Sequence, residues 1–166
     1  MASGLFFDPM LLLRASPLIT STCSLWYAWD EQFFLSIFTR PENEFESSAL
    51  LPSYFNTFFQ RGTASVLTVL ALTLSSSAAN LYTDRSVLSA RGSLKWYIAG
   101  TILSAAHLLF APLIVPVIKA IVEDREGENA VPNVKEWLRV NAIRTLTVDL
   151  AAWGAFAIAV TRTLRV

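Results

Sequence analysis

Long stretches without charge alternate with short polar segments along this chain. Residues 62–83 hold no Asp, Glu, Lys or Arg over 22 positions, and residues 96–118 hold none over 23. A third stretch, 145–161, covers 17 positions in which Asp149 is the single charged side chain. An apolar helix of about 20 residues, rising about 1.5 Å per residue, crosses a bilayer core of about 30 Å. The pattern therefore predicts three membrane-spanning helices here.

A further helix is expected between Arg14 and Arg40, and it reaches a membrane-spanning length only if Asp30 and Glu31 lie inside it. The stretch LWYAWDEQFF follows its apolar part. Aromatic residues are unfavourable at a signal-peptide cleavage site, which favours a retained helix over a cleaved signal. We therefore predict an all-α fold, one integral membrane four-helix bundle over residues 1–166. Its helices are expected at about 11–39, 62–83, 96–120 and 133–163.

The remaining segments bear on packing and orientation. Residues 40–62 begin polar and acidic and then carry aromatic residues at helical spacing, which predicts an interfacial amphipathic segment. Six Lys and Arg residues fall on one side of the expected membrane and seven on the other, so the positive-inside rule predicts no orientation. Small residues let helices approach closely in lipid. We expect close helix contacts at Ser75, Ser76, Ser77, Ala78, Ala79, Ala151, Ala152, Gly154 and Ala155.

Composition agrees with a membrane protein and excludes several other classes. Of the 166 residues, 54% are hydrophobic and 16% charged, whereas a soluble domain carries about 25% charged residues. Net charge is zero, so nothing favours binding to a nucleic-acid backbone. A single cysteine, Cys23, rules out an intramolecular disulfide and a zinc site of several thiolates. Dinucleotide-binding, P-loop and metal-ligand motifs are absent from the sequence, so we expect no cofactor and no metal.

Four ionisable residues interrupt the apolar segments: Asp30, Glu31, His107 and Asp149. Charged groups inside a membrane are costly and usually face the interior of a bundle, where they mark functional sites. Counted from the charged residues that end each span, Asp30, His107 and Asp149 lie at depths of about 15, 18 and 8 Å from one face. We therefore expect a shared internal polar cavity that includes Asp30, His107, Asn141, Arg144 and Asp149, with walls of Trp26, Tyr27, Phe34, Trp137 and Trp153.

Simpler interpretations stay open for some of these residues. Asp30 and Glu31 are adjacent, about 100° apart around a helix, so both cannot face one small pocket. His107 could be a neutral imidazole bonded to a neighbour on its own helix. Arg144 and Asp149 are five residues apart, about 140° around an α-helix, so a direct pair requires the arginine side chain to wrap around the helix.

The motif W-x-x-x-N-x-x-R, formed by Trp137, Asn141 and Arg144, follows YIAGTILSAAHLLFAPLIVPVIKAI with its histidine and two prolines. This combination resembles the small four-helix membrane proteins of fungal and bacterial gene clusters that are grouped with the anthrone oxygenases. The resemblance covers most of the chain in helix number and loop lengths. It implies oxidation of a lipophilic anthrone without metal or flavin, with His107, Asn141 and Arg144 lining the substrate pocket. WYAWDE in the first helix and Asp149 in the last depart from that family's pattern.

The chain is also similar in size and topology to small membrane proteins of fungal polyene-pyrone clusters, those of aurovertin- and citreoviridin-like products, which are assigned epoxide-opening hydrolase and cyclase roles. Opening an epoxide needs a base and an acid, and burial in apolar surroundings favours the protonated acid. We therefore predict a membrane-embedded enzyme of fungal polyketide biosynthesis that opens an epoxide by hydrolysis or cyclisation. Asp30 and Asp149 would divide the base and acid roles, with Tyr27 donating a hydrogen bond to the epoxide oxygen.

The other predicted site residues bind or orient the substrate: Asn141, Arg144, Trp26, Trp137 and Glu31. The first alternative is a cofactor-independent anthrone oxygenase in which His107 removes the substrate proton. The second is a non-enzymatic membrane scaffold or transport subunit. The expected partners are a lipophilic small molecule and membrane lipid, a homo-oligomer is compatible with the sequence, and we expect the protein in the endoplasmic reticulum.

Overall fold

A computed structural model of the protein describes residues 8–124 and 128–165. These residues form helices and turns and contain no β-strand, which confirms the predicted all-α class. In chain order the elements are α1 (Pro9–Ile37), η2 (Pro41–Asn43), α2 (Glu44–Thr83), α3 (Arg85–Ala90), α4 (Leu94–Ala106), η3 (His107–Phe110), α5 (Ala111–Glu123), α6 (Ala130–Arg144), η4 (Thr145–Asp149) and α7 (Leu150–Leu164).

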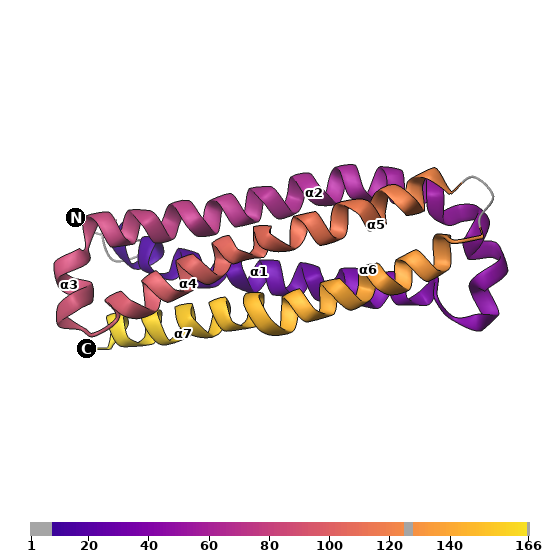
Figure 1. Ribbon diagram of the computed structural model, residues 1–166. Coiled ribbons are helices and arrows are strands. Elements are labelled where there is room, and N and C mark those ends of the chain that lie inside the picture. The colour runs from indigo at the N-terminus through magenta and orange to yellow at the C-terminus, as the bar shows by residue number, and fades with distance from the viewer. Residues whose placement is uncertain (1–7, 125–127, 166) are drawn as a thin grey trace.

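The long helices run as four antiparallel columns (Figure 1): α1, α2, α4 continued by α5, and α6 continued by α7. The start of α1 and the end of α7 lie at the same end of the bundle, next to the short helix α3. At this end Arg14 of α1 donates to Asp84, the residue after α2, at 2.7 Å. A partly buried ion pair thus connects the start of α1 with the end of α2.

Helix α2 is 40 residues long and begins at Glu44, where the sequence suggested a link followed by an interfacial segment. Glu44 and Glu46 lie in its first turn, where acidic side chains stabilise the N-terminal end of a helix. The aromatic residues expected to lie at an interface continue directly into the apolar stretch after Arg61, so a single helix serves both. The predicted start of this helix near residue 62 is therefore wrong, because helical spacing extends through the polar part as well.

Three columns are long and apolar enough to cross a membrane: Pro41–Thr83, Leu94–Glu123 and Ala130–Leu164. Helix α1 is not among the spans found in the described residues, so the predicted set of four spans is supported for three. Even so, α1 presents an apolar outer surface, since its Trp26, Trp29, Phe33 and Phe34 are each more than half exposed. Large aromatic side chains on an outer surface are typical of a membrane–water interface.

Two columns depart from α-helical geometry near their middle. The 3₁₀ turn η3 covers His107–Phe110, and in it the amide of Ala111 bonds to the carbonyl of Leu108. Pro112 has no amide hydrogen to bond to that carbonyl, which explains the tighter turn at this point. In the other column Thr145–Asp149 form a π-helix, in which the amide of Leu150 bonds to the carbonyl of Thr145, five residues earlier. Such turns are rare and occur frequently at functional sites.

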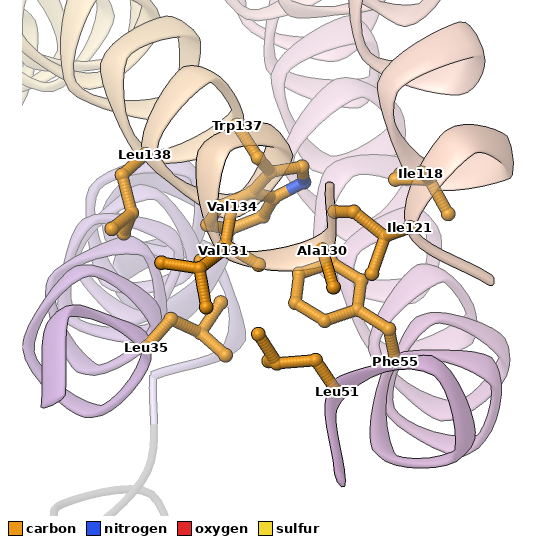
Figure 2. Packing of buried hydrophobic residues seen from close by; sticks show 10 residues of the cluster. All are labelled: Leu35, Leu51, Phe55, Ile118, Ile121, Ala130, Val131, Val134, Trp137 and Leu138. Carbon is orange, nitrogen blue, oxygen red and sulfur yellow. The ribbon is translucent and has the colours of Figure 1, made fainter. Parts of the chain in front are cut away.

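Two hydrophobic clusters hold the bundle, one toward each end. The cluster farther from the termini (Figure 2) contains Leu35 from α1, Leu51 and Phe55 from α2, Ile118 and Ile121 from α5, and Ala130, Val131, Val134, Trp137 and Leu138 from α6. Within it the rings of Phe55 and Trp137 meet edge to face, with centroids 6.0 Å apart. The other cluster contains Leu88, Tyr97, Phe156, Ala159 and Val160.

Only some of the small residues expected at helix contacts lie there. Ser77, Ala152 and Ala155 are buried, and Ser77 shares a hydrogen bond of 2.6 Å with Thr101 of α4. Ser75, Ala78, Ala79, Ala151 and Gly154 are exposed or partly exposed, and Ser76 bonds to the backbone of its own helix. A run of small residues covers all sides of a helix, and one side alone packs.

Candidate functional site

A network of three charged or ionisable side chains lies between the two hydrophobic clusters. The Nδ1 of His107 lies 2.9 Å from Oδ1 of Asp149, and Nε of Arg144 donates to Oδ2 of Asp149 at 3.1 Å. All three side chains are about nine-tenths buried. Both oxygens of the Asp149 carboxylate are therefore engaged, one by histidine and one by arginine.

The π-helix explains how Arg144 reaches Asp149. A hydrogen bond from residue i to residue i+5 brings side chains five positions apart onto the same side of the helix, whereas an α-helix separates them by about 140°. The predicted wrapping of the arginine side chain is thus unnecessary. The residue types of Thr145–Asp149 do not by themselves indicate a π turn. Arg-x-x-x-x-Asp inside an apolar stretch is the signal that could have suggested it.

The network continues from Arg144 to the first helix. Nη2 of Arg144 donates to the side-chain oxygen of Asn141 at 2.7 Å. The side-chain nitrogen of Asn141, Nδ2, in turn donates to the side-chain oxygen of Gln32 at 3.2 Å and to the backbone carbonyl of Ala28 at 3.3 Å. Gln32 is a member that sequence reasoning missed. Because each group in the chain orients the next, the position of the His107 ring depends on contacts with three helical columns.

The contact with Asp149 also determines which histidine nitrogen is available for chemistry. A carboxylate only accepts hydrogen bonds, so the Nδ1 of His107 carries the hydrogen. In a neutral imidazole this leaves Nε2 with a free lone pair that can accept a proton or a hydrogen bond. Asp149 therefore positions His107, and both of its carboxylate oxygens are already engaged, by His107 and by Arg144.

A cavity of about 280 Å³ borders this network, between α1, α2, η3 with α5, and α6. His107, Arg144, Glu31 and Trp137 line one part of it. The rest of the wall consists mainly of aliphatic and aromatic side chains, among them Phe59, Val66, Phe110 and Ile114. An apolar space with a few polar groups at one end suits a largely apolar small molecule.

Glu31 is the carboxylate of the first helix that faces this cavity. Its side chain is buried, and none of the hydrogen bonds or ion pairs found among the described residues involves its carboxylate. On the facing side of the cavity wall, α2 has Gly62, where an added Cβ would lie 3.0 Å from the Tyr27 hydroxyl and 3.8 Å from Oε1 of Glu31. A glycine here lets α2 pass close to both side chains.

Several predicted site residues lie elsewhere. Asp30 does not line this 280 Å³ cavity; it lies with Tyr27 and Phe34 at an adjoining cavity of about 180 Å³, which shares Glu31 and Phe58 with the first. Trp26 and Phe34 are more than half exposed on the outer surface. The nitrogen of Trp153 donates to Thr22 at 2.9 Å, away from the network. The buried positions of this part of α1 are Ala28, Glu31 and Leu35, three and four residues apart, so the helical phase selects Glu31 and excludes Asp30.

The remaining predicted residues are brought together: His107, Asn141, Arg144 and Asp149 in the network, and Glu31 and Trp137 in the cavity wall. The pairing of Asp30 with Asp149 as acid and base is not supported by this geometry. Among the described residues, no group of three or more His, Cys, Asp or Glu side chains is arranged to hold a metal ion.

Comparison with known proteins finds relatives that are named epoxidases and come from fungi. It is 31% identical over 156 residues to the epoxidase pydX of an Acremonium species, an alignment that covers 94% of this chain and 96% of the relative. The chain belongs to the family of this epoxidase. The epoxidase gkaX of Penicillium citrinum is 30% identical over 146 residues, covering 86% of this chain and 88% of the relative. The probable epoxidase scpX of Mollisia scopiformis is 28% identical over 153 residues, covering 92% and 96%.

No family model matches the chain, and no solved structure matches it. Membership in the epoxidase family supports an enzyme, and it agrees with the sequence-based expectation at the level of epoxide chemistry. The names of these relatives do not distinguish the finer alternatives that the sequence raised.

Proposed function

We propose that the protein is a membrane-embedded enzyme that forms an epoxide on a carbon–carbon double bond of a lipophilic substrate, which is held in the 280 Å³ cavity beside the network. The observation that carries this proposal is the cavity itself: an apolar space of about 280 Å³ that ends at the His107–Asp149–Arg144 network, in a chain whose relatives are named epoxidases. The three membrane-length columns and the exposed aromatic residues of α1 support embedding in a bilayer.

The geometry suggests a role for each polar group at the cavity. Nε2 of His107 would accept a proton or a hydrogen bond from the reacting species. Arg144 would stabilise negative charge that develops on oxygen, since none of the described hydrogen bonds uses its Nη1 and the residue lines the cavity. Glu31 would supply or take up a proton from the α1 side. Asp149 and Asn141 act through their partners and are positioning residues.

Epoxide formation and epoxide opening differ in their demand for oxygen. Formation inserts one oxygen atom into a double bond, so it consumes either a peroxide or molecular oxygen with two electrons and two protons. Hydrolysis and cyclisation rearrange bonds without an oxidant. The chemical distinction can therefore be tested without knowing the natural substrate in full.

Epoxide opening is the second candidate, and one observation favours it. The cavity wall holds a base, His107, together with a carboxyl group, Glu31, that has no partner among the described residues. An unpaired carboxyl group and a base at one site are what acid–base opening requires. In this form of the mechanism Glu31 takes the place that the sequence assigned to Asp30. Anthrone oxidation and a non-enzymatic membrane role rest on the sequence alone.

The deciding experiment supplies membranes containing the protein with a lipophilic polyene and, separately, with the corresponding polyene epoxide. We expect the polyene to be converted to an epoxide that carries one ¹⁸O atom when ¹⁸O₂ and a cellular reductant are present. Glu31→Gln and His107→Gln should lose this turnover. Asp30→Asn is the matched control, because Asp30 is a neighbouring carboxylate that does not line the 280 Å³ cavity. This variant should retain turnover. If the protein converts the polyene epoxide but not the polyene, and does so equally fast with and without oxygen, the reaction is epoxide opening and the proposal of epoxide formation is wrong.

A further inference from the structure

The residues that line the cavity differ widely in exposure. At the inner end His107, Glu31 and Trp137 are each less than one-tenth exposed. At the outer end Leu67 of α2 is 49% exposed and Val115 of α5 is 52% exposed. These exposed residues of α2 and α5 indicate that the cavity opens on the side of the bundle where the two helices face each other, and the rim that they form is apolar.

Position along the two helices places this rim inside the hydrocarbon region of a bilayer. On α2 the last charged residue before the apolar stretch is Arg61, and Leu67 lies six residues further, about 9 Å along the helix axis. On α5 the first charged residue after the apolar stretch is Lys119, and Val115 lies four residues before it, about 6 Å along the axis. Both helices thus place the opening below the level of the charged groups, where it would face lipid chains.

A second hollow lies next to α2, around Arg61. A surface groove of about 560 Å³ lies there, lined by Tyr27, Tyr54, Arg61 and Ser65. It shares the lining residues Phe58 and Gly62 with the 280 Å³ cavity. The Tyr27 hydroxyl packs against Gly62 so closely that an added Cβ would lie 3.0 Å away. The Tyr27 hydroxyl thus occupies the space beside Gly62, the residue of α2 that lines both the groove and the 280 Å³ cavity.

We propose that the substrate enters the 280 Å³ cavity sideways from the bilayer, between α2 and α5, with its reacting end first. The proposal rests on the proposed membrane-embedded function. It also defines the substrate class. A volume of about 280 Å³ is just below the range of small-molecule sites, which span roughly 300–1,000 Å³. The substrate is therefore an elongated lipophilic molecule whose reacting end occupies the cavity while the rest extends through the rim among the lipid chains.

Photolabelling tests the opening without requiring turnover. The full-length protein is reconstituted in vesicles of phosphatidylcholine that carry a diazirine within one acyl chain, illuminated, digested and examined by mass spectrometry. We expect adducts on His107 or Trp137, which are too buried to meet lipid unless a chain enters the cavity. Val115→Trp should fill the rim and abolish these adducts.

Matched controls separate blockage from misfolding. Leu113→Trp adds the same ring to an exposed position of α5 that does not line the cavity, and it should leave the adducts unchanged. Leu67→Trp and Leu72→Trp form a second such pair on α2. Thermal unfolding of each variant is also measured, and a Tm equal to that of the wild type confirms that the fold is unchanged.

The two proposals fail in distinguishable ways. Cavity adducts that Val115→Trp removes, in a protein that forms no epoxide from any polyene, would support lateral entry and contradict the proposed reaction. Epoxide formation with no adduct on either buried residue, or with equal adducts in Val115→Trp and Leu113→Trp, would overturn lateral entry and leave the reaction standing.

Discussion

Two glycines in the apolar helices should respond in opposite directions to the same substitution, Gly→Ala. Gly100 of α4 faces Phe156 of α7 across the cluster next to the chain termini. A Cβ added at Gly100 would lie 2.6 to 2.8 Å from three carbons of the Phe156 ring. At Gly154 of α7 an added Cβ would meet no atom within 4 Å. The first substitution forces a close helix contact apart, and the second places a methyl group in open space.

The size of each effect follows from two opposing contributions. Alanine is favoured over glycine inside a helix by about 1 kcal/mol. Overpacking a buried contact costs about 1–3 kcal/mol, and Gly100 belongs at the upper end because the Phe156 ring is completely buried and cannot swing into solvent. The net change in unfolding free energy is then a loss of about 2 kcal/mol for Gly100→Ala and a gain of about 1 kcal/mol for Gly154→Ala.

Thermal unfolding in detergent measures both. For a chain of this length 1 kcal/mol corresponds to about 2–4 °C in Tm, so Gly100→Ala should lower Tm by about 4–8 °C while Gly154→Ala raises it by about 2–4 °C. Adding Phe156→Leu to Gly100→Ala should restore part of the loss, because the smaller side chain makes room for the new methyl group. A Tm for Gly100→Ala equal to or above that of the wild type would refute the packing of α4 on α7.

Four further variants test the polar network, the ion pair at the end of the bundle and the core. Asp149→Asn should destabilise the protein by about 3–5 kcal/mol in detergent unfolding, because it leaves Arg144 buried without its carboxylate, and Arg144→Met combined with Asp149→Leu should cost less than that. Arg14→Gln removes the charged hydrogen bond to Asp84 and should cost about 1–2 kcal/mol in the same assay; no change would mean that the pair is solvated. Trp137→Ala should cost about 3–5 kcal/mol, and a smaller loss would indicate that the surrounding aromatic side chains collapse into the space.

The charge-free stretches were sufficient to predict where the apolar parts of three columns lie, because a charged group is costly to bury in any apolar surrounding. The same signal could not mark the start of α2, because acidic, polar and aromatic residues are mixed between Glu44 and Arg61 and still form a helix. It also could not decide between Asp30 and Glu31. That choice depends on the rotation of α1 about its axis, which packing against the other columns determines.

The site was predicted in its members more than in its chemistry. Depth counting brought His107 and Asp149 to one region of the bundle, and the structure joins them directly. Their relation to Arg144 was misjudged because the count assumed an unbroken α-helix. With the π turn in place, Asp149 bonds to both neighbours, and Glu31 is the carboxyl group of the cavity wall that has no partner in the described part of the chain.

The π turn also has a use outside this protein. An arginine and an aspartate that pair within one regular helix are separated by two or three intervening residues, whereas the pair here is separated by four. One extra position thus records an irregular backbone in the sequence itself. Arg-x-x-x-x-Asp embedded in an apolar stretch, with Asn three positions before the arginine, can be searched for in any translated genome. A chain that carries it can be inspected for a histidine on another helix that would complete the same buried network.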